Sequence, residues 1–114
     1  MSPDDRIGNV IERHPGGYFL NVFDHRDRTL ALMDEHELQG GGPTWLGLVT
    51  AALELESPLT LEQVDFDDEA DVLLVTCSER PPLEIVQTYA SLLMSDETFL
   101  LQCMEHARSG GYLE

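Results

Sequence analysis

The sequence of 114 residues contains no lysine, and its basic side chains are six arginines. It carries 22 aspartates and glutamates, so its formal net charge is -16 at pH 7. This shortage of positive charge argues against direct binding of nucleic acid or of an anionic membrane surface, because like charges would be brought together. It favours a basic protein partner, since complementary electrostatic fields raise the rate of association. A simpler alternative is that the charge serves only solubility.

Cysteine is scarce, and neither Cys77 nor Cys103 lies in a CxxC or another nucleophile motif. The opening residues MSPDDRIGNV lack the apolar segment of a signal peptide. No apolar run approaches the roughly 18 residues that a membrane span needs. We therefore expect a cytoplasmic protein with reduced thiols. Without a linker or a repeat, we expect a single domain over residues 1–114, with frayed ends at 1–6 and 109–114.

The N-terminal third has the pattern of a β-meander. Residues 7–12 and 18–23 favour strands, and a turn of His, Pro and two glycines separates them. A polar turn over residues 24–28 follows, and residues 29–33 (TLALM) then read as a further strand. We expect two or three antiparallel strands here.

The rest of the chain alternates between helical and strand patterns. After three glycines, apolar residues at helical spacing predict a helix over residues 43–55. Residues 60–66 and 71–77 predict a hairpin whose second strand is central in the sheet. Two helices follow, one from about residue 81 and one capped by Ser95 or Asp96. The fold class is α+β, a mainly antiparallel sheet with about three helices packed on one face.

We find no pattern that predicts catalysis, a cofactor or a metal site. The alternating carboxylates of residues 65–71 resemble a calcium loop, but Ala70 and Thr76 stand where that loop needs glycine and glutamate. The glycines before the helix are not followed by the lysine of a phosphate-binding loop. We expect a protein that binds a partner and is not an enzyme.

The concentration of negative charge near residue 68 marks the candidate partner-binding residues. The hairpin supplies Asp65, Asp67, Asp68, Glu69 and Asp71, and we expect Glu54, Glu56 and Glu62 to extend the same surface. Trp45, the only tryptophan, opens the first long helix. It is either a core anchor, which we favour, or a hot spot of the interface.

Three motifs in this order carry a family resemblance. Gly-Gly-Pro-Thr-Trp-Leu-Gly-Leu opens a helix at residues 41–48, Val-Asp-Phe-Asp-Asp-Glu-Ala-Asp follows at 64–71, and Ser-Asp-Glu stands at 95–97. Together they resemble the immunity protein 51 family of bacterial polymorphic toxin systems. The matching positions are Trp45, Phe66, Asp67, Glu69, Ala70, Asp96 and Glu97. The chain departs from the family pattern at Gly41 or Gly42, where asparagine is usual, and at Thr44, where aspartate is usual.

The resemblance implies a cytoplasmic antitoxin, encoded beside a secreted effector, that neutralises the toxic domain of this effector and has no catalytic residues of its own. A basic nuclease domain would suit such an acidic inhibitor. Two alternatives remain: an acidic adaptor or regulatory domain unrelated to toxins, and a small enzyme or ligand-binding domain. The adaptor would lack a neighbouring effector gene, and the enzyme would have a polar pocket.

Overall fold

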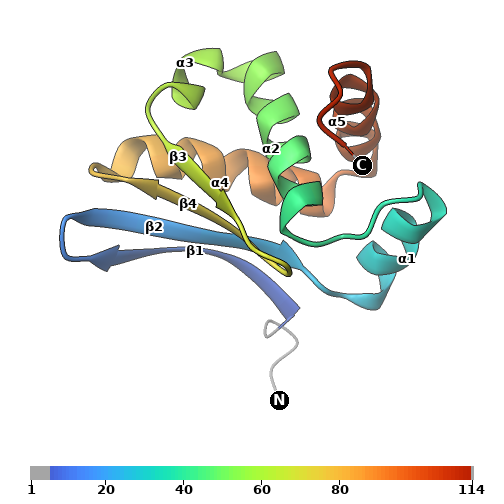
Figure 1. Cartoon of the computed structure of the whole chain (residues 1–114), viewed down its shortest axis with the longest axis horizontal. Coiled ribbons are helices and arrows are strands. Elements are labelled where there is room, and N and C mark those ends of the chain that lie inside the picture. Colours follow the sequence, from blue (N-terminus) through green and yellow to red (C-terminus); the bar gives the residue numbers. More distant parts are fainter. Residues whose placement is uncertain (1–5, 114) are drawn as a thin grey trace.

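A computed structural model describes residues 6–113 of the chain. Figure 1 shows four strands side by side, with helices α2 to α5 gathered on one side of them and α1 beyond the end of β2. The elements in chain order are β1 (Ile7–His14), β2 (Gly17–Asp24), α1 (Asp27–Glu35), α2 (Gly42–Glu56), α3 (Pro58–Leu61), β3 (Asp65–Asp68), β4 (Leu73–Cys77), α4 (Arg80–Ser95) and α5 (Glu97–Ser109). The predicted α+β class is confirmed, with five helices where about three were expected.

The sheet is antiparallel throughout, in the order β1-β2-β4-β3. The second strand of the predicted hairpin, β4, is central as expected, because it pairs with both β2 and β3. Leu20 on β2 lies opposite Ile11 on β1 and Val75 on β4, and all three side chains are buried. Since side chains alternate along a strand, this row defines the face of the sheet on which the helices pack.

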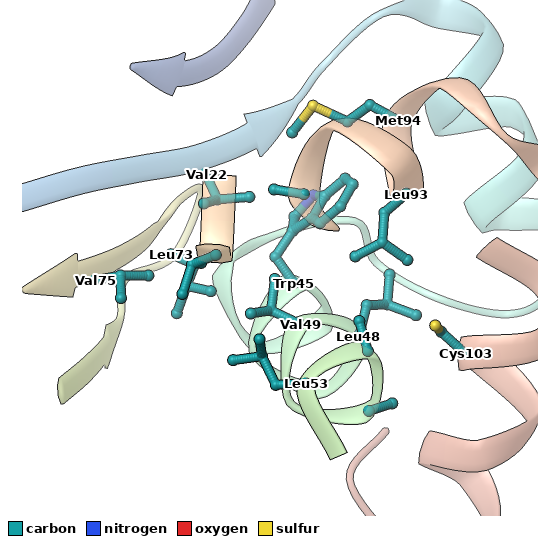
Figure 2. Close-up of a cluster of buried hydrophobic side chains, with 14 of the residues drawn as sticks. Val22, Trp45, Leu48, Val49, Leu53, Leu73, Val75, Leu93, Met94 and Cys103 are labelled. Atoms are coloured by element: carbon teal, nitrogen blue, oxygen red, sulfur yellow. The ribbon is translucent and has the colours of Figure 1, made fainter. Parts of the chain in front are cut away.

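Helix α2 fills the centre of the core. The side chain of Trp45 is 0% exposed, and Figure 2 shows it among Val22 and Leu73 of the sheet and Leu93 and Met94 of α4. Its indole Nε1 has no hydrogen-bond partner among the described residues. In this structure Trp45 is therefore a core anchor, and its side chain is not available as a hot spot on the surface.

The expected strand over residues 29–33 is wrong, because these residues belong to helix α1. Leucine, alanine and methionine are strong helix formers, and Thr29 and Met33 lie one helical turn apart on the buried side. A five-residue stretch of alternating leucines is compatible with either structure, and here the helical spacing of the buried residues decides.

The first strand of the predicted hairpin is also shorter than expected. Residues 58–61 form the short helix α3, in which Pro58 occupies the first turn and the hydroxyls of Ser57 and Thr60 lie 2.8 Å apart. Strand β3 begins only at Asp65. The later boundaries agree better with expectation, since the Asp96 carboxylate accepts a hydrogen bond from the Phe99 N–H and caps α5. No helix within residues 6–113 is long and apolar enough to cross a membrane.

Candidate partner-binding surface

The β3–β4 hairpin presents its carboxylates to solvent. Asp65, Asp67, Asp68, Glu69 and Asp71 are all exposed. None of the five forms an ion pair with another residue of the described chain, where the ion pairs involve Asp24, Asp27, Glu54 and Glu84. The hairpin therefore presents negative charge that no arginine of the described chain neutralises.

The tip of this hairpin packs against the first turn of α2. The Gly42 N–H donates to the carbonyl oxygen of Ala70 at 3.2 Å. A β-carbon at Gly42 would collide with the carbonyl oxygens of Glu69 and Val72, and one at Gly41 would collide with that of Ala70. The glycine stretch thus permits close approach of two backbones, a role beyond the helix start that we expected from sequence.

The hairpin turn is also closed on itself and attached to the end of β2. The Glu69 N–H donates to the Val72 carbonyl at 2.9 Å, and His25 Nε2 lies 3.1 Å from the Asp71 carbonyl oxygen. The N-terminus of a helix carries a partial positive charge, and the first turn of α2 has no acidic residue of its own. The backbone of the turn that bears Glu69 and Asp71 is therefore held by α2, by its own hydrogen bond and by His25.

Thr44, which stands where family members usually have aspartate, points inward. Its side chain is buried, and its Oγ1 accepts a hydrogen bond from the Gly40 N–H at 3.2 Å. The threonine thus fixes the loop that leads into α2. It does not belong to the exposed surface.

Strand alternation divides the acidic residues of the hairpin between two faces. Asp67 lies opposite Leu74, whereas Asp68 lies opposite the buried Leu73. Asp65 shares the face of Asp67, because the two are separated by one residue. The five carboxylates therefore surround the hairpin on several sides and do not form one flat patch.

The glutamates expected to extend this surface lie away from the tip. Glu54 and Glu56 are at the far end of α2, about 18 and about 21 Å from Gly42 at a rise of about 1.5 Å per residue. Glu56 and Glu62 are exposed on either side of α3, near the start of β3. The acidic residues thus follow the length of β3 from α3 to the tip at α2 (Figure 1).

Glu54 faces α5 and is engaged within the protein. Its carboxylate accepts hydrogen bonds from the Tyr112 hydroxyl at 2.7 Å, and His106 Nε2 lies 3.0 Å from Oε1. The bond from Tyr112 is the largest effect and lowers the pKa of Glu54, burial opposes it to a smaller extent, and His106 lowers the pKa further. The bond with Glu54 correspondingly raises the pKa of Tyr112. Glu54 therefore joins α2 to the end of the chain, apart from the hairpin.

Asp24, which no sequence pattern singles out, is the one fully buried carboxylate of the described chain. It accepts bonds from Arg26 Nη2 at 2.8 Å, from Arg26 Nε at 3.0 Å and from the Thr29 hydroxyl at 2.7 Å. Arg26 Nη2 also donates to the Met94 carbonyl at the end of α4. Burial raises the pKa of Asp24, but the bonds from Arg26 and Thr29 outweigh it and lower the pKa overall.

The two cysteines are free. Burial, with a smaller effect of Glu56, raises the pKa of Cys103 to about 11, so its thiol remains protonated at neutral pH. Among residues 6–113, no group of three or more His, Cys, Asp or Glu side chains is placed to hold a metal ion.

Comparison with known proteins identifies the family of the chain. No curated protein and no solved structure matches the chain. A family model described as immunity protein 51 matches residues 9–109, from the first strand through the last helix. This match covers most of the chain and includes all three motifs on which the resemblance depends. The chain therefore belongs to the immunity protein 51 family.

Proposed function

We propose that this protein binds and neutralises the toxic domain of a cognate bacterial effector, and that this domain is basic. Membership of an immunity protein family supports a toxin partner in general. The observation that carries the finer proposal is the rigid hairpin with five exposed carboxylates that form no ion pair within the described chain. Such a surface is complementary to Lys and Arg side chains.

The physical advantage of this surface is rapid capture. Opposite fields raise association rates toward about 10⁸ to 10⁹ M⁻¹s⁻¹ at low salt. Because α2 and His25 fix the turn, the carboxylates lose little conformational freedom on binding. A toxin that acts on nucleic acid needs a basic surface for phosphates, and an acidic inhibitor would occupy that surface. The protein itself then requires no catalytic group and acts in the cytoplasm of the cell that makes the toxin.

An adaptor role unrelated to toxins would use the same acidic surface with another partner. A small enzyme would instead place polar groups with shifted pKa values around a pocket. Five surface hollows of the described chain have volumes of about 370 to 510 Å³, and Asp24, Glu54 and Cys103 line none of them. Arg26 lines one of them, and its bond with Asp24 raises its pKa. The shifted groups are thus explained by internal contacts, and no observation favours the enzymatic alternative.

Co-expression tests the proposal directly. The C-terminal domain of the effector encoded beside this gene is expressed in a bacterial host with and without the protein. We expect the domain alone to stop growth and co-expression to restore it. A domain that is harmless, or that kills equally in both strains, would remove the support for a toxin-neutralising role.

A further inference from the structure

The sheet has a second face, which the described helices leave uncovered. The side chains of the buried row Ile11, Leu20 and Val75 point toward α2 and α4. The alternate residues point the other way, and the strand pairing aligns them in rows across the sheet. We call these residues the open sheet face: Gly8, Val10, Glu12, Phe19, Asn21, Phe23, Asp65, Asp67, Leu74 and Thr76.

Four apolar side chains of the open sheet face surround Asn21, which lies opposite Val10 on β1 and Leu74 on β4. Val10 is 67% exposed, and Phe19, Phe23 and Leu74 are half-buried. None of the four belongs to the hydrophobic core or to the residues that pack against it. Apolar side chains grouped in this way on the surface of a strongly charged protein are characteristic of a binding surface.

The aromatic rings of this face are fixed by their neighbours. Phe23 lies over Gly8, where a β-carbon would collide with the ring, and its centroid is 4.9 Å from that of His25. The Phe19 ring lies 5.6 Å from His14. Rings with few remaining rotamers lose little entropy on binding, which is why aromatic residues are common at the centre of interfaces.

Carboxylates lie at both edges of the open sheet face. Glu12 stands on the edge strand β1, and Asp65 and Asp67 stand on the opposite edge strand β3. The open sheet face contains no arginine, because Arg13 on β1 points to the face that the helices cover. Apolar residues around one central polar group, with carboxylates at the rim, fit the usual anatomy of a protein interface, in which apolar contacts lie inside a polar rim.

We propose that the open sheet face is the docking surface for the toxin domain, which presents an apolar patch ringed by Lys and Arg. This inference rests on the proposed function and names the surface that performs it. Charge decides between this occupant and a second copy of the chain. Two copies packed face to face would bring together two rims of carboxylates on molecules of net charge -16, whereas a basic rim neutralises them.

A matched pair of substitutions tests the surface. Val10→Lys and Leu59→Lys each replace an exposed aliphatic residue, 67% and 73% exposed, and change the net charge equally. Leu59 lies on α3, which packs against α2 and α4 on the covered side of the sheet. Binding of both purified variants to the toxin domain is measured by surface plasmon resonance. We expect Val10→Lys to weaken affinity at least about tenfold, mainly through faster dissociation, and Leu59→Lys to change it less than about twofold.

The outcomes separate the two proposals. If the wild-type protein fails to bind the toxin domain, the proposed function fails and this inference fails with it. If the wild type binds and Val10→Lys binds as well as Leu59→Lys, the open sheet face is not the docking surface, although the proposed function stands. Sedimentation provides a second measurement, because a wild-type dimer that Val10→Lys dissociates would assign the face to a second copy. Circular dichroism, with Val10→Thr as a variant that retains β-branching, verifies that each variant is folded.

Discussion

Asp24 and the carboxylates of the β3–β4 hairpin are the same chemical group in opposite surroundings. Asp24 is fully buried and accepts four hydrogen bonds from Arg26 and Thr29, which join β2 to α1. The hairpin carboxylates are exposed and form no ion pair with the described chain. A buried carboxylate that is fully paired contributes to the fold, whereas exposed unpaired ones contribute a field that acts on other molecules.

Substitution at Asp24 should have the largest effect on stability. Asp24→Ala leaves the Arg26 guanidinium and the Thr29 hydroxyl without their shared acceptor. We expect the free energy of unfolding to fall by about 3 kcal/mol, from the lost bonds to a charged group and the unpaired Thr29 hydroxyl, while Arg26, whose side chain is 33% exposed, stays partly hydrated. Urea unfolding measures this change. Asp68→Ala is the control, because an exposed carboxylate without an ion pair should change the value by less than about 0.5 kcal/mol. If both variants lowered the free energy of unfolding equally, the buried and the exposed carboxylates would not differ in their contribution to the fold.

The burial of Asp24 also predicts that its contribution to the free energy of unfolding depends on pH. The pKa of Asp24 in the folded protein is lowered from its usual value of 3.8, so the unfolded chain binds this proton more tightly. The stabilisation from Asp24 is therefore complete above that value and is lost as the pH falls through the lower folded-state pKa. The difference in unfolding free energy between the wild type and Asp24→Ala, followed from about pH 6 to about pH 3, should shrink toward acid pH. A difference that stays constant would mean that the charge of Asp24 does not carry the effect.

The sequence predicted the α+β class, the position of β4 in the sheet and a cap at Ser95 or Asp96, of which the structure has Asp96, because each depends on a local pattern. It failed at residues 29–33, where alternating leucines fit a strand as well as a helix. The Asp24 network and the open sheet face were also missed. The bonds of Asp24 to Arg26 and Thr29 are local, but the burial of Asp24 and the bond from Arg26 to the Met94 carbonyl depend on long-range packing. The pairing of β2 with β4, which sets Phe19 beside Thr76, is long-range as well. Spacing along the chain carries no information about such contacts.

The attachment of the hairpin to α2 can be broken without changing its charge. By helix propensity alone, Gly42→Ala would stabilise the protein by up to about 1 kcal/mol. The collision of the new β-carbon with the Glu69 and Val72 carbonyls predicts the opposite sign, a loss of about 1 to 3 kcal/mol. Urea unfolding decides between the signs. We also expect faster hydrogen exchange at the Gly42 and Glu69 amides, and a stabilised variant would mean that the close approach does not constrain the hairpin.

Charge reversal at the hairpin should have the smallest effect on stability but a clear effect on the rate of association. Replacing Asp67, Asp68 and Glu69 with lysine removes the field at the tip and leaves the core intact. We expect association with the toxin domain to slow several-fold at low salt, and the effect to fade near 1 M salt, where the screening length is about 3 Å.

The control replaces the exposed Asp34, Glu35 and Glu105 on α1 and α5 with lysine, which changes the net charge equally. Because total charge is matched, a slower rate in the hairpin variant alone locates the steering field at the hairpin. Equal rates in the two variants would make the hairpin a solubilising turn and leave steering to the molecule as a whole.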